Sequence, residues 1–133
     1  MVMNLSGIGG AGDLSNATYD NTKFKIMYTN RAVGKGSHAE GSGNIAQGDN
    51  SHSEGRRTVS QGTNSHSEGL NAQAIGNQSH AEGNATVSSG SASHAEGKNS
   101  ISSGSFSHAE GENTQAMGHR SHAEGNMAIA KGK

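Results

Sequence analysis

The pentapeptide Ser-His-Ala/Ser-Glu-Gly occurs seven times along this chain, and each copy begins 14 residues after the one before it. The copies begin at Ser37, Ser51, Ser65, Ser79, Ser93, Ser107 and Ser121. A second glycine follows the pentapeptide's own glycine by seven residues, so each repeat divides into two halves that both end in glycine. A fixed period of this kind is the signature of a repeat protein, in which one short unit stacks on the next.

The repeat length indicates which secondary structure the unit contains. Fourteen residues are too few for a pair of helices, which takes more than about 30 residues, but they fit two short strands joined by two tight turns. Alternation favours a strand in the first half. There Ser37, Ala39 and Gly41 share one face, and His38 and Glu40 share the other.

The second half of the repeat has the same alternation, with Asn44, Ala46 and Gly48 on one face and Ile45 and Gln47 on the other. Each strand therefore has one face of small residues, and two such faces can approach closely. Leu, Ile, Val and Phe make up only about 11% of the chain, below the roughly 20% that usually accompanies an ordinary core. We expect a narrow coil filled by Ala, Ser, Thr and Gly.

Successive coils are expected to stack as parallel strands about 4.8 Å apart, with each coil hydrogen-bonded to the next. The pairs Asp49-Asn50, Thr63-Asn64 and Asn77-Gln78 are predicted turn residues between the halves. The glycines are expected to supply turn conformations that are closed to residues with a Cβ atom. These predicted turn residues are Gly34, Gly41, Gly48, Gly55, Gly62, Gly69, Gly76, Gly83, Gly90, Gly97, Gly104, Gly111, Gly118, Gly125 and Gly132.

Two regions follow from the extent of the repeats. Residues 30–133 are predicted to form a β-roll of seven repeats, and residues 1–29 an N-terminal linker and cap. Three of the chain's four aromatic residues precede the first repeat, which suits a cap. Because Lys133 directly follows the last repeat glycine, we expect the chain to be a segment of a longer protein or to continue elsewhere.

A single chain is not expected to bury enough apolar surface to fold alone. At about 25 cal/mol per Å², an interior of small residues hardly offsets the entropy of ordering roughly 90 residues. One outward face should therefore be buried between identical chains. The candidates are the His/Glu face of the first strand and the Ile/Val/Gln face of the second.

Uniformity favours the His/Glu face, because it is the same in all seven copies while the second face changes from Ile45 to Gln73 and from Gln47 to Met117. Imidazoles and carboxylates can also satisfy each other at an interface. The Ile/Val/Gln face remains the alternative. The predicted interface residues are His38, Glu40, His52, Glu54, His66, Glu68, His80, Glu82, His94, Glu96, His108, Glu110, His122 and Glu124.

The repeat, with Ser-x-Ala-x-Gly in its first strand, resembles the YadA-like head repeat of trimeric autotransporter adhesins over about residues 30–132. Ser37, Ala39 and Gly41 match the family pattern Ser-Val-Ala-Ile-Gly, whereas His38 and Glu40 replace its Val and Ile. The resemblance implies an all-β fold, a left-handed parallel β-roll solenoid of 14-residue, two-strand coils. It also implies a homotrimer with the first strands turned toward the three-fold axis. The two replacements imply a polar axis instead of a dry apolar one.

The same resemblance implies a non-catalytic segment of a surface adhesin, with a role in structural display and host-surface attachment at the cell surface. A host ligand would contact the variable outer edge (Ser42, Arg56, Leu70 and their equivalents) or the Ile/Val/Gln face. The Ser-His-Ala-Glu-Gly variant also resembles repeats of bacteriophage tail-fibre and appendage proteins, so the shaft of a virion fibre is the alternative.

Charge and hydropathy point to no other partner. The formal net charge of −1 comes without a basic patch, so no nucleic acid is expected. No run of about 18 apolar residues is present, so this segment is not expected to insert into a membrane.

The regular His and Glu residues also prompt chemical interpretations. His38 and Glu40, at positions i and i+2 of a strand, are roughly 7 Å apart, which is poor chelating geometry, so no metal ligand or cofactor is assigned within a chain. Around a three-fold axis, imidazoles of three chains could hold a transition metal or an anion, and this is a third functional alternative. Ser37 points away from His38, so a Ser-His-Glu triad, and hence enzyme activity, is not expected.

Overall fold

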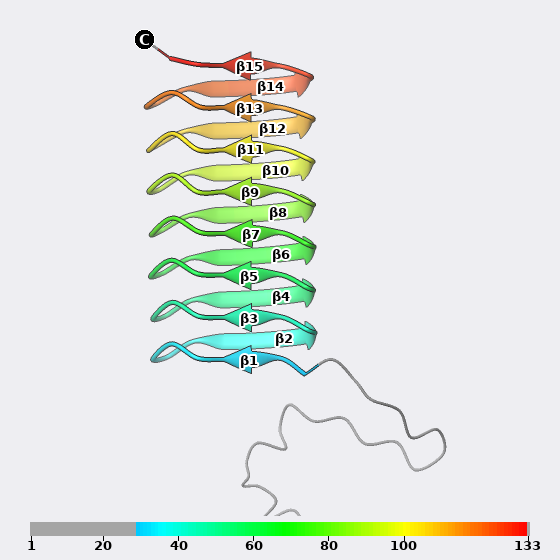
Figure 1. The fold of residues 1–133 in the computed structure, drawn as a ribbon, viewed down its shortest axis with the longest axis vertical. Helices are drawn as coiled ribbons and strands as arrows, with labels where there is room; N and C mark the ends of the chain where they lie inside the picture. The colour runs from blue at the N-terminus through cyan, green and yellow to red at the C-terminus, as the bar shows by residue number, and fades with distance from the viewer. Residues whose placement is uncertain (1–28, 133) are drawn as a thin grey trace, which may run out of the picture.

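The chain is an all-β parallel solenoid in the computed structural model, which describes residues 29–132. Each coil contributes one longer and one shorter strand, and the coils stack along the long axis (Figure 1). The predicted cap in residues 1–29 lies outside the described residues, except for residue 29. Within residues 29–132, no helix is long and apolar enough to cross a membrane.

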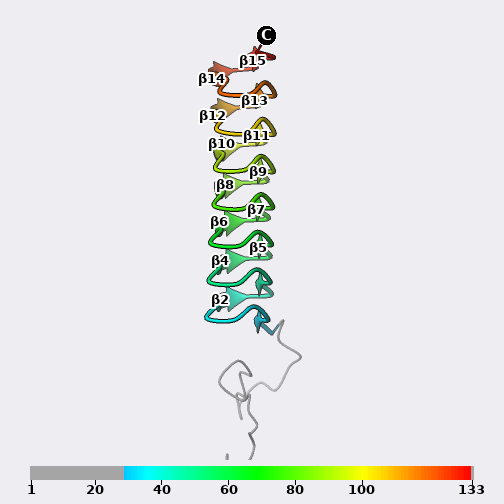
Figure 2. The ribbon, with the colours of Figure 1, turned by 90° about the vertical axis from the view of Figure 1, so that its left-hand side faces the viewer.

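The strands form two parallel sheets on opposite sides of the coil, which Figure 2 shows from the side. The seven-stranded sheet contains the longer strands: β2 (His38–Ser42), β4 (His52–Arg56), β6 (His66–Leu70), β8 (His80–Asn84), β10 (His94–Lys98), β12 (His108–Glu112) and β14 (His122–Asn126). The eight-stranded sheet contains the shorter ones: β1 (Arg31–Ala32), β3 (Ile45–Ala46), β5 (Val59–Ser60), β7 (Gln73–Ala74), β9 (Val87–Ser88), β11 (Ile101–Ser102), β13 (Gln115–Ala116) and β15 (Ile129–Ala130).

The register aligns each residue with its equivalent 14 positions later. In the pairing of β4 with β6, His52 lies beside His66, and Glu54 beside Glu68. The same register holds throughout both sheets. Equivalent positions of successive repeats are therefore stacked at strand spacing, which confirms the predicted 14-residue, two-strand coil.

The interior of the solenoid consists of small side chains, as the alternation predicts. Among residues 29–132, the buried apolar side chains are all alanines, and serines, threonines and one asparagine make up the buried polar residues. Many of the hydroxyls bond to one another: Ser53 to Thr58 at 2.8 Å and Ser60 to Ser67 at 2.6 Å, between oxygen atoms. The core is thus narrow and hydrogen-bonded, with little apolar area.

Asn44 is among the largest fully buried side chains of the described residues. Its Oδ1 accepts hydrogen bonds from the backbone nitrogen and the hydroxyl of Thr58, at 2.8 and 2.9 Å. Its Nδ2 donates to the carbonyl oxygen of Gly55 at 2.8 Å. Asn44 therefore links neighbouring coils through both ends of its amide.

The repeat glycines serve two different purposes, which corrects the expectation that all of them supply turn conformations. Gly48 and its equivalents lack positive φ angles, except for Gly132 with φ of 75°. A Cβ on Gly48 would lie 2.1 Å from the carbonyl oxygen of Gly62, so close approach between coils requires glycine there. Gly55 and its equivalents lie inside the longer strands instead of in turns, with φ between 104° and 119°.

Residues other than glycine take the left-handed conformation in the turns. Asn50, Asn64 and Gln78, all in predicted turn pairs, have φ of 56°, 58° and 59°. Asn tolerates this region better than most residues. Serine then closes the turn, since the Ser65 hydroxyl donates to the carbonyl oxygen of Gly62 at 2.6 Å.

Candidate functional site

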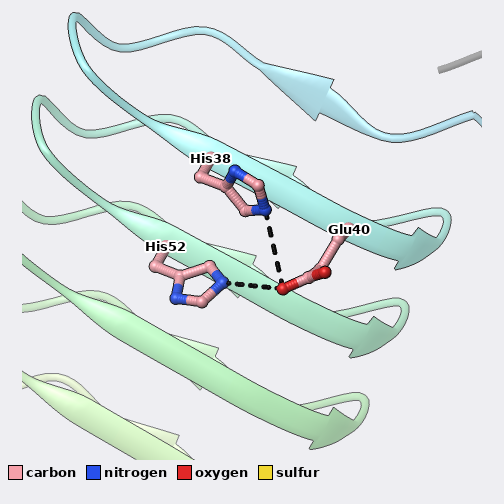
Figure 3. A group of neighbouring side chains, drawn as sticks. All are labelled: His38, Glu40 and His52. Carbon is pink, nitrogen blue, oxygen red and sulfur yellow. Dashed lines mark hydrogen bonds and ion pairs between the residues drawn. The ribbon is translucent and has the colours of Figure 1, made fainter. Parts of the chain in front are cut away.

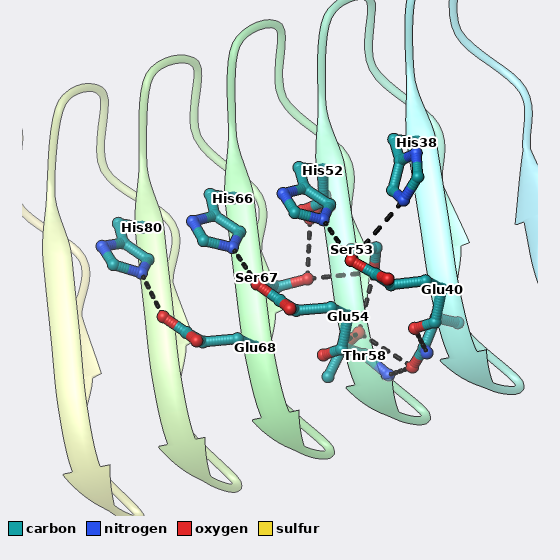
Figure 4. A network of polar contacts seen from close by, with 12 residues as sticks. His38, Glu40, His52, Ser53, Glu54, Thr58, His66, Ser67, Glu68 and His80 are labelled. Carbon is teal, nitrogen blue, oxygen red and sulfur yellow. Dashed lines mark hydrogen bonds and ion pairs between the residues drawn. The ribbon is translucent and has the colours of Figure 1, made fainter.

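The outward side chains of the longer strands form a continuous ladder of histidine and glutamate, named here the His/Glu face. It consists of the 14 residues predicted from the sequence: His38, Glu40, His52, Glu54, His66, Glu68, His80, Glu82, His94, Glu96, His108, Glu110, His122 and Glu124. Because successive residues of a strand point to opposite sides, His and Glu at i and i+2 share this face, while the Ser or Ala between them faces the interior and is buried from the second coil onward. Figure 4 shows the first part of the ladder.

The imidazole rings form a stacked column along the solenoid. From His52 to His122, neighbouring ring centroids are 4.7–4.9 Å apart and the ring planes differ by only 2–11°. The first step differs, because the ring of His38 is turned 81° from that of His52. The regular stacking follows from the in-register parallel pairing of identical residues.

The carboxylates connect neighbouring coils in the first part of the ladder. Nε2 of His66 lies 3.1 Å from Oε1 of Glu54, and Nε2 of His80 lies 3.3 Å from Oε1 of Glu68 (Figure 4). His52, His66 and His80 thus each contact the glutamate of the coil before them. These contacts add side-chain links to the backbone hydrogen bonds between coils.

The pattern changes at His94. Its Nε2 lies 3.3 Å from carboxylate oxygens of both Glu82, in the preceding coil, and Glu96, in its own coil. Beyond it the contact within a coil is the shorter one, as in the 3.2 Å between His122 Nε2 and Glu124 Oε2. Identical repeats therefore adopt two side-chain arrangements.

The His/Glu face is half-buried by its own stacking and open on its outer side. The ladder side chains of the five inner coils are 32–38% exposed, whereas those of the first and last coils are 55–64% exposed. Burial lowers the pKa of His80 below its usual value, and the neighbouring imidazoles of His94 and His66 lower it further, while Glu68 and Glu82 oppose the shift.

The structure does not place a ladder serine beside a ladder histidine as nucleophile and base. From Ser51 onward, the serine before each ladder histidine is buried within the coil; Ser65 is 2% exposed, and its hydroxyl donates to the carbonyl oxygen of Gly62. His66 points outward from the adjacent position. Among residues 29–132, the ladder serines thus lie on the opposite side of the strand from the ladder histidines.

The ladder does bring possible metal ligands together. Groups of two histidines and one glutamate, such as His38, Glu40 and His52, have ligand atoms within 4.8 Å of one another. The expectation of poor chelating geometry, based on backbone spacing, is wrong here, because the side chains bring Nε2 of His38 to within 3.5 Å of Oε1 of Glu40.

The opposite face, on the shorter strands, is less regular. Ile101 and Met117 are 37% and 40% exposed, and Gln61 donates through Nε2 to Oε1 of Gln47 at 3.4 Å. The variable outer edge carries an ion pair, with 3.2 Å between Lys98 Nζ and Glu112 Oε1. Neither surface has the uniform composition of the His/Glu face.

Sequence reasoning identified the residues of the ladder and the pairing of imidazole with carboxylate, but not the stacking of the rings or which coil supplies each partner. The stacking of the imidazoles could have been inferred from the 14-residue period, because parallel strands in register at about 4.8 Å place equivalent imidazoles at stacking distance. The two carboxylate arrangements had no sequence signal, because the pentapeptides that carry them are nearly identical.

The fold and its outward ladder define the class of protein: a regular, two-sheet parallel β-solenoid built from a short structural repeat. The family model of the YadA head domain repeat matches residues 53–79, 81–107, 95–121 and 109–132. The chain therefore belongs to the YadA head repeat family, which confirms the resemblance seen in the sequence. Comparison with curated proteins found no matching relative.

Proposed function

We propose that this chain is a non-catalytic head segment of a trimeric surface adhesin, displayed at the cell surface. Three left-handed β-rolls lie around a three-fold axis with their His/Glu faces turned inward. The observation that carries the proposal is the His/Glu face itself, which is uniform over seven coils on a chain whose own core holds only small side chains. Membership of a family of structural adhesin domains supports the role in display.

The composition of the core supports association. Alanine is the only apolar residue among the buried side chains of the described part of the chain. Hydrophobic stabilisation scales with buried apolar area, at about 25 cal/mol per Å², so an alanine core supplies little. Burial of an outer face between chains adds the missing area, because a solenoid this narrow has more surface than interior.

The regularity of the His/Glu face supports its choice as the contact surface. Backbone register places His on His and Glu on Glu in every coil, so identical chains can meet with the same contact repeated in each layer. The ladder side chains of the inner coils are about one-third exposed in the single chain, for example 34% for His66 and 37% for Glu68. This exposed surface is available for contact with another chain.

Charge pairing makes a polar interface feasible. Each carboxylate has an imidazole within hydrogen-bonding or ion-pair distance in its own chain, such as Glu54 with His66 at 3.1 Å. A buried carboxylate is costly unless it is paired, and the adjacent imidazole provides that pairing when it carries the proton. The ladder therefore takes the place of the Val and Ile of the resembled family pattern.

The test is the mass of the native chain in solution. Light scattering coupled to size-exclusion chromatography should give three times the chain mass of 13.5 kDa. A folded, monomeric chain with the circular dichroism of a β protein would overturn the proposed trimer. Attachment is tested separately, by binding of the trimer to host-cell surfaces, with a variant of the outer edge (Lys98→Glu) as the comparison.

The shaft of a virion fibre is the second candidate. The pentapeptide Ser-His-Ala-Glu-Gly supports it, because this variant resembles repeats of bacteriophage tail-fibre and appendage proteins. The two candidates share the fold and the trimer. Gene neighbourhood separates them: an outer-membrane anchor domain downstream supports the adhesin, and adjacent tail genes support the virion fibre.

A further inference from the structure

The first step of the His/Glu ladder has a geometry that the other steps lack. The ring planes of His38 and His52 are nearly perpendicular, at 81°, with centroids 5.0 Å apart. Nε2 of both rings points to one atom, Oε1 of Glu40, at 3.5 and 3.3 Å (Figure 3). Two imidazoles and a carboxylate thus converge on one point at the end of the ladder.

Ring orientation decides whether two imidazoles can share a metal ion. An ion bound to Nε2 lies along the nitrogen lone pair, in the plane of the ring and about 2.0–2.1 Å from the nitrogen. Stacked rings, such as those of His66 and His80 with planes 5° apart, lie in separate planes and cannot both meet this condition. The planes of His38 and His52 intersect, so one ion can lie in both.

The distances at this step also suit a metal. Ligand atoms at about 2.1 Å from a tetrahedral ion are about 3.4 Å apart, and the two Nε2–Oε1 distances are 3.5 and 3.3 Å. All three ligand atoms lie within 4.8 Å of one another. In the single chain, His38 and Glu40 have room to adjust, because their side chains are 63% and 56% exposed.

We propose that His38, Glu40 and His52 form a binding site for one transition-metal ion of the zinc class. Two imidazoles and one carboxylate are a known zinc ligand set, with the remaining position left to water. Nitrogen ligands favour Zn²⁺, Co²⁺ or Ni²⁺ over Mg²⁺ and Ca²⁺, which prefer oxygen. The site needs only one chain and goes beyond the proposed role in display.

The test is calorimetric titration of zinc into the untagged, metal-stripped full chain at about pH 7.5, where imidazole is mostly neutral. One ion should bind per chain. His38→Gln and His52→Gln should each weaken binding by at least about tenfold. His80→Gln, which removes a stacked imidazole in the middle of the ladder, is the matched control and should leave affinity and stoichiometry unchanged.

Cobalt gives a second measurement. The intense visible absorption of tetrahedral Co²⁺ should develop with the native chain and with His80→Gln, but not with His38→Gln. Absence of binding at millimolar zinc, several ions per chain with equal loss in His80→Gln, or no effect of His38→Gln would each overturn the site. Circular dichroism of each variant ensures that the comparison is made between folded proteins.

Failure of this site and failure of the trimer give different results. Light scattering in the presence of a chelator reports the oligomer without metal. A trimer that binds no zinc rejects only the metal site, and a monomer that binds one zinc rejects only the trimer. One ion per three chains would place the metal on the axis and would overturn the site at His38, Glu40 and His52.

Discussion

A Cβ atom added to Gly69 would lie 2.2 Å from the carbonyl oxygen of Gly83, the equivalent residue of the next coil. Gly125 has the same φ of 109°, yet a Cβ added there would meet nothing within 4 Å. Glycine can be required at this repeat position for two reasons: a left-handed backbone and close approach to the next coil. The first reason applies to both Gly69 and Gly125, and the second applies only to Gly69.

Alanine at these two positions should therefore have unequal effects. Gly125→Ala should cost about 1–2 kcal/mol, the cost of a left-handed residue with a Cβ. Gly69→Ala should cost about 1–3 kcal/mol more, because the coils must shift to relieve the contact. Urea unfolding followed by circular dichroism measures both. Equal losses would show that only backbone conformation matters at this position.

The buried threonines offer a second matched pair. Thr58 Oγ1 bonds to Asn44 Oδ1 at 2.9 Å and to Ser53 Oγ at 2.8 Å. The hydroxyl of Thr86 is buried without a hydrogen-bond partner among the described residues, because its equivalent neighbours are alanines, Ala72 and Ala81.

Valine should therefore be tolerated in place of Thr86 but not in place of Thr58. Thr58→Val should destabilise the chain by about 1–3 kcal/mol, since it leaves the Asn44 amide with one partner fewer. Thr86→Val should be neutral or stabilising by up to about 1 kcal/mol, because it removes an unsatisfied hydroxyl. Thermal unfolding compares the two. A larger loss in Thr86→Val than in Thr58→Val would contradict the hydrogen-bond assignment.

The His/Glu face should make stability depend on pH through His80. Its pKa is lowered in the folded chain, first by burial and then by the imidazoles of His94 and His66. The folded state thus binds the proton less tightly than the unfolded state. The stability contributed by this group is present above the usual pKa of about 6.5 and is lost as the pH falls through the folded-state pKa.

We therefore expect the melting temperature to fall between about pH 7.5 and pH 5.5, with a smaller fall in His80→Gln. His122→Gln, at the more exposed end of the ladder, is the control and should follow the native pH profile. Stability that rises on acidification would contradict the direction of the shift. It would mean that carboxylates outweigh burial at this imidazole.

The sequence period predicted the architecture but not its details. The 14-residue spacing and the alternation around Ala46 and Ser53 predict the coil, its small-residue interior and the outward ladder, because each follows from local geometry. The turned ring of His38 and the change of partner at His94 were not predictable, because they depend on rotamers and on position within the stack. The role of Gly48 depends on the distance to the next coil, which alternation does not give.

Cross-linking between chains shows directly which face joins them. The chain has no cysteine, so a single introduced thiol reports one position only. Glu68→Cys places it on the His/Glu face, and Gln73→Cys on the outward side of β7 in the other sheet. Treatment of the native assembly with a short bis-maleimide should link chains through Glu68→Cys and not through Gln73→Cys. Linkage through Gln73→Cys alone would instead place the Ile/Val/Gln face at the interface and overturn the role of the His/Glu face.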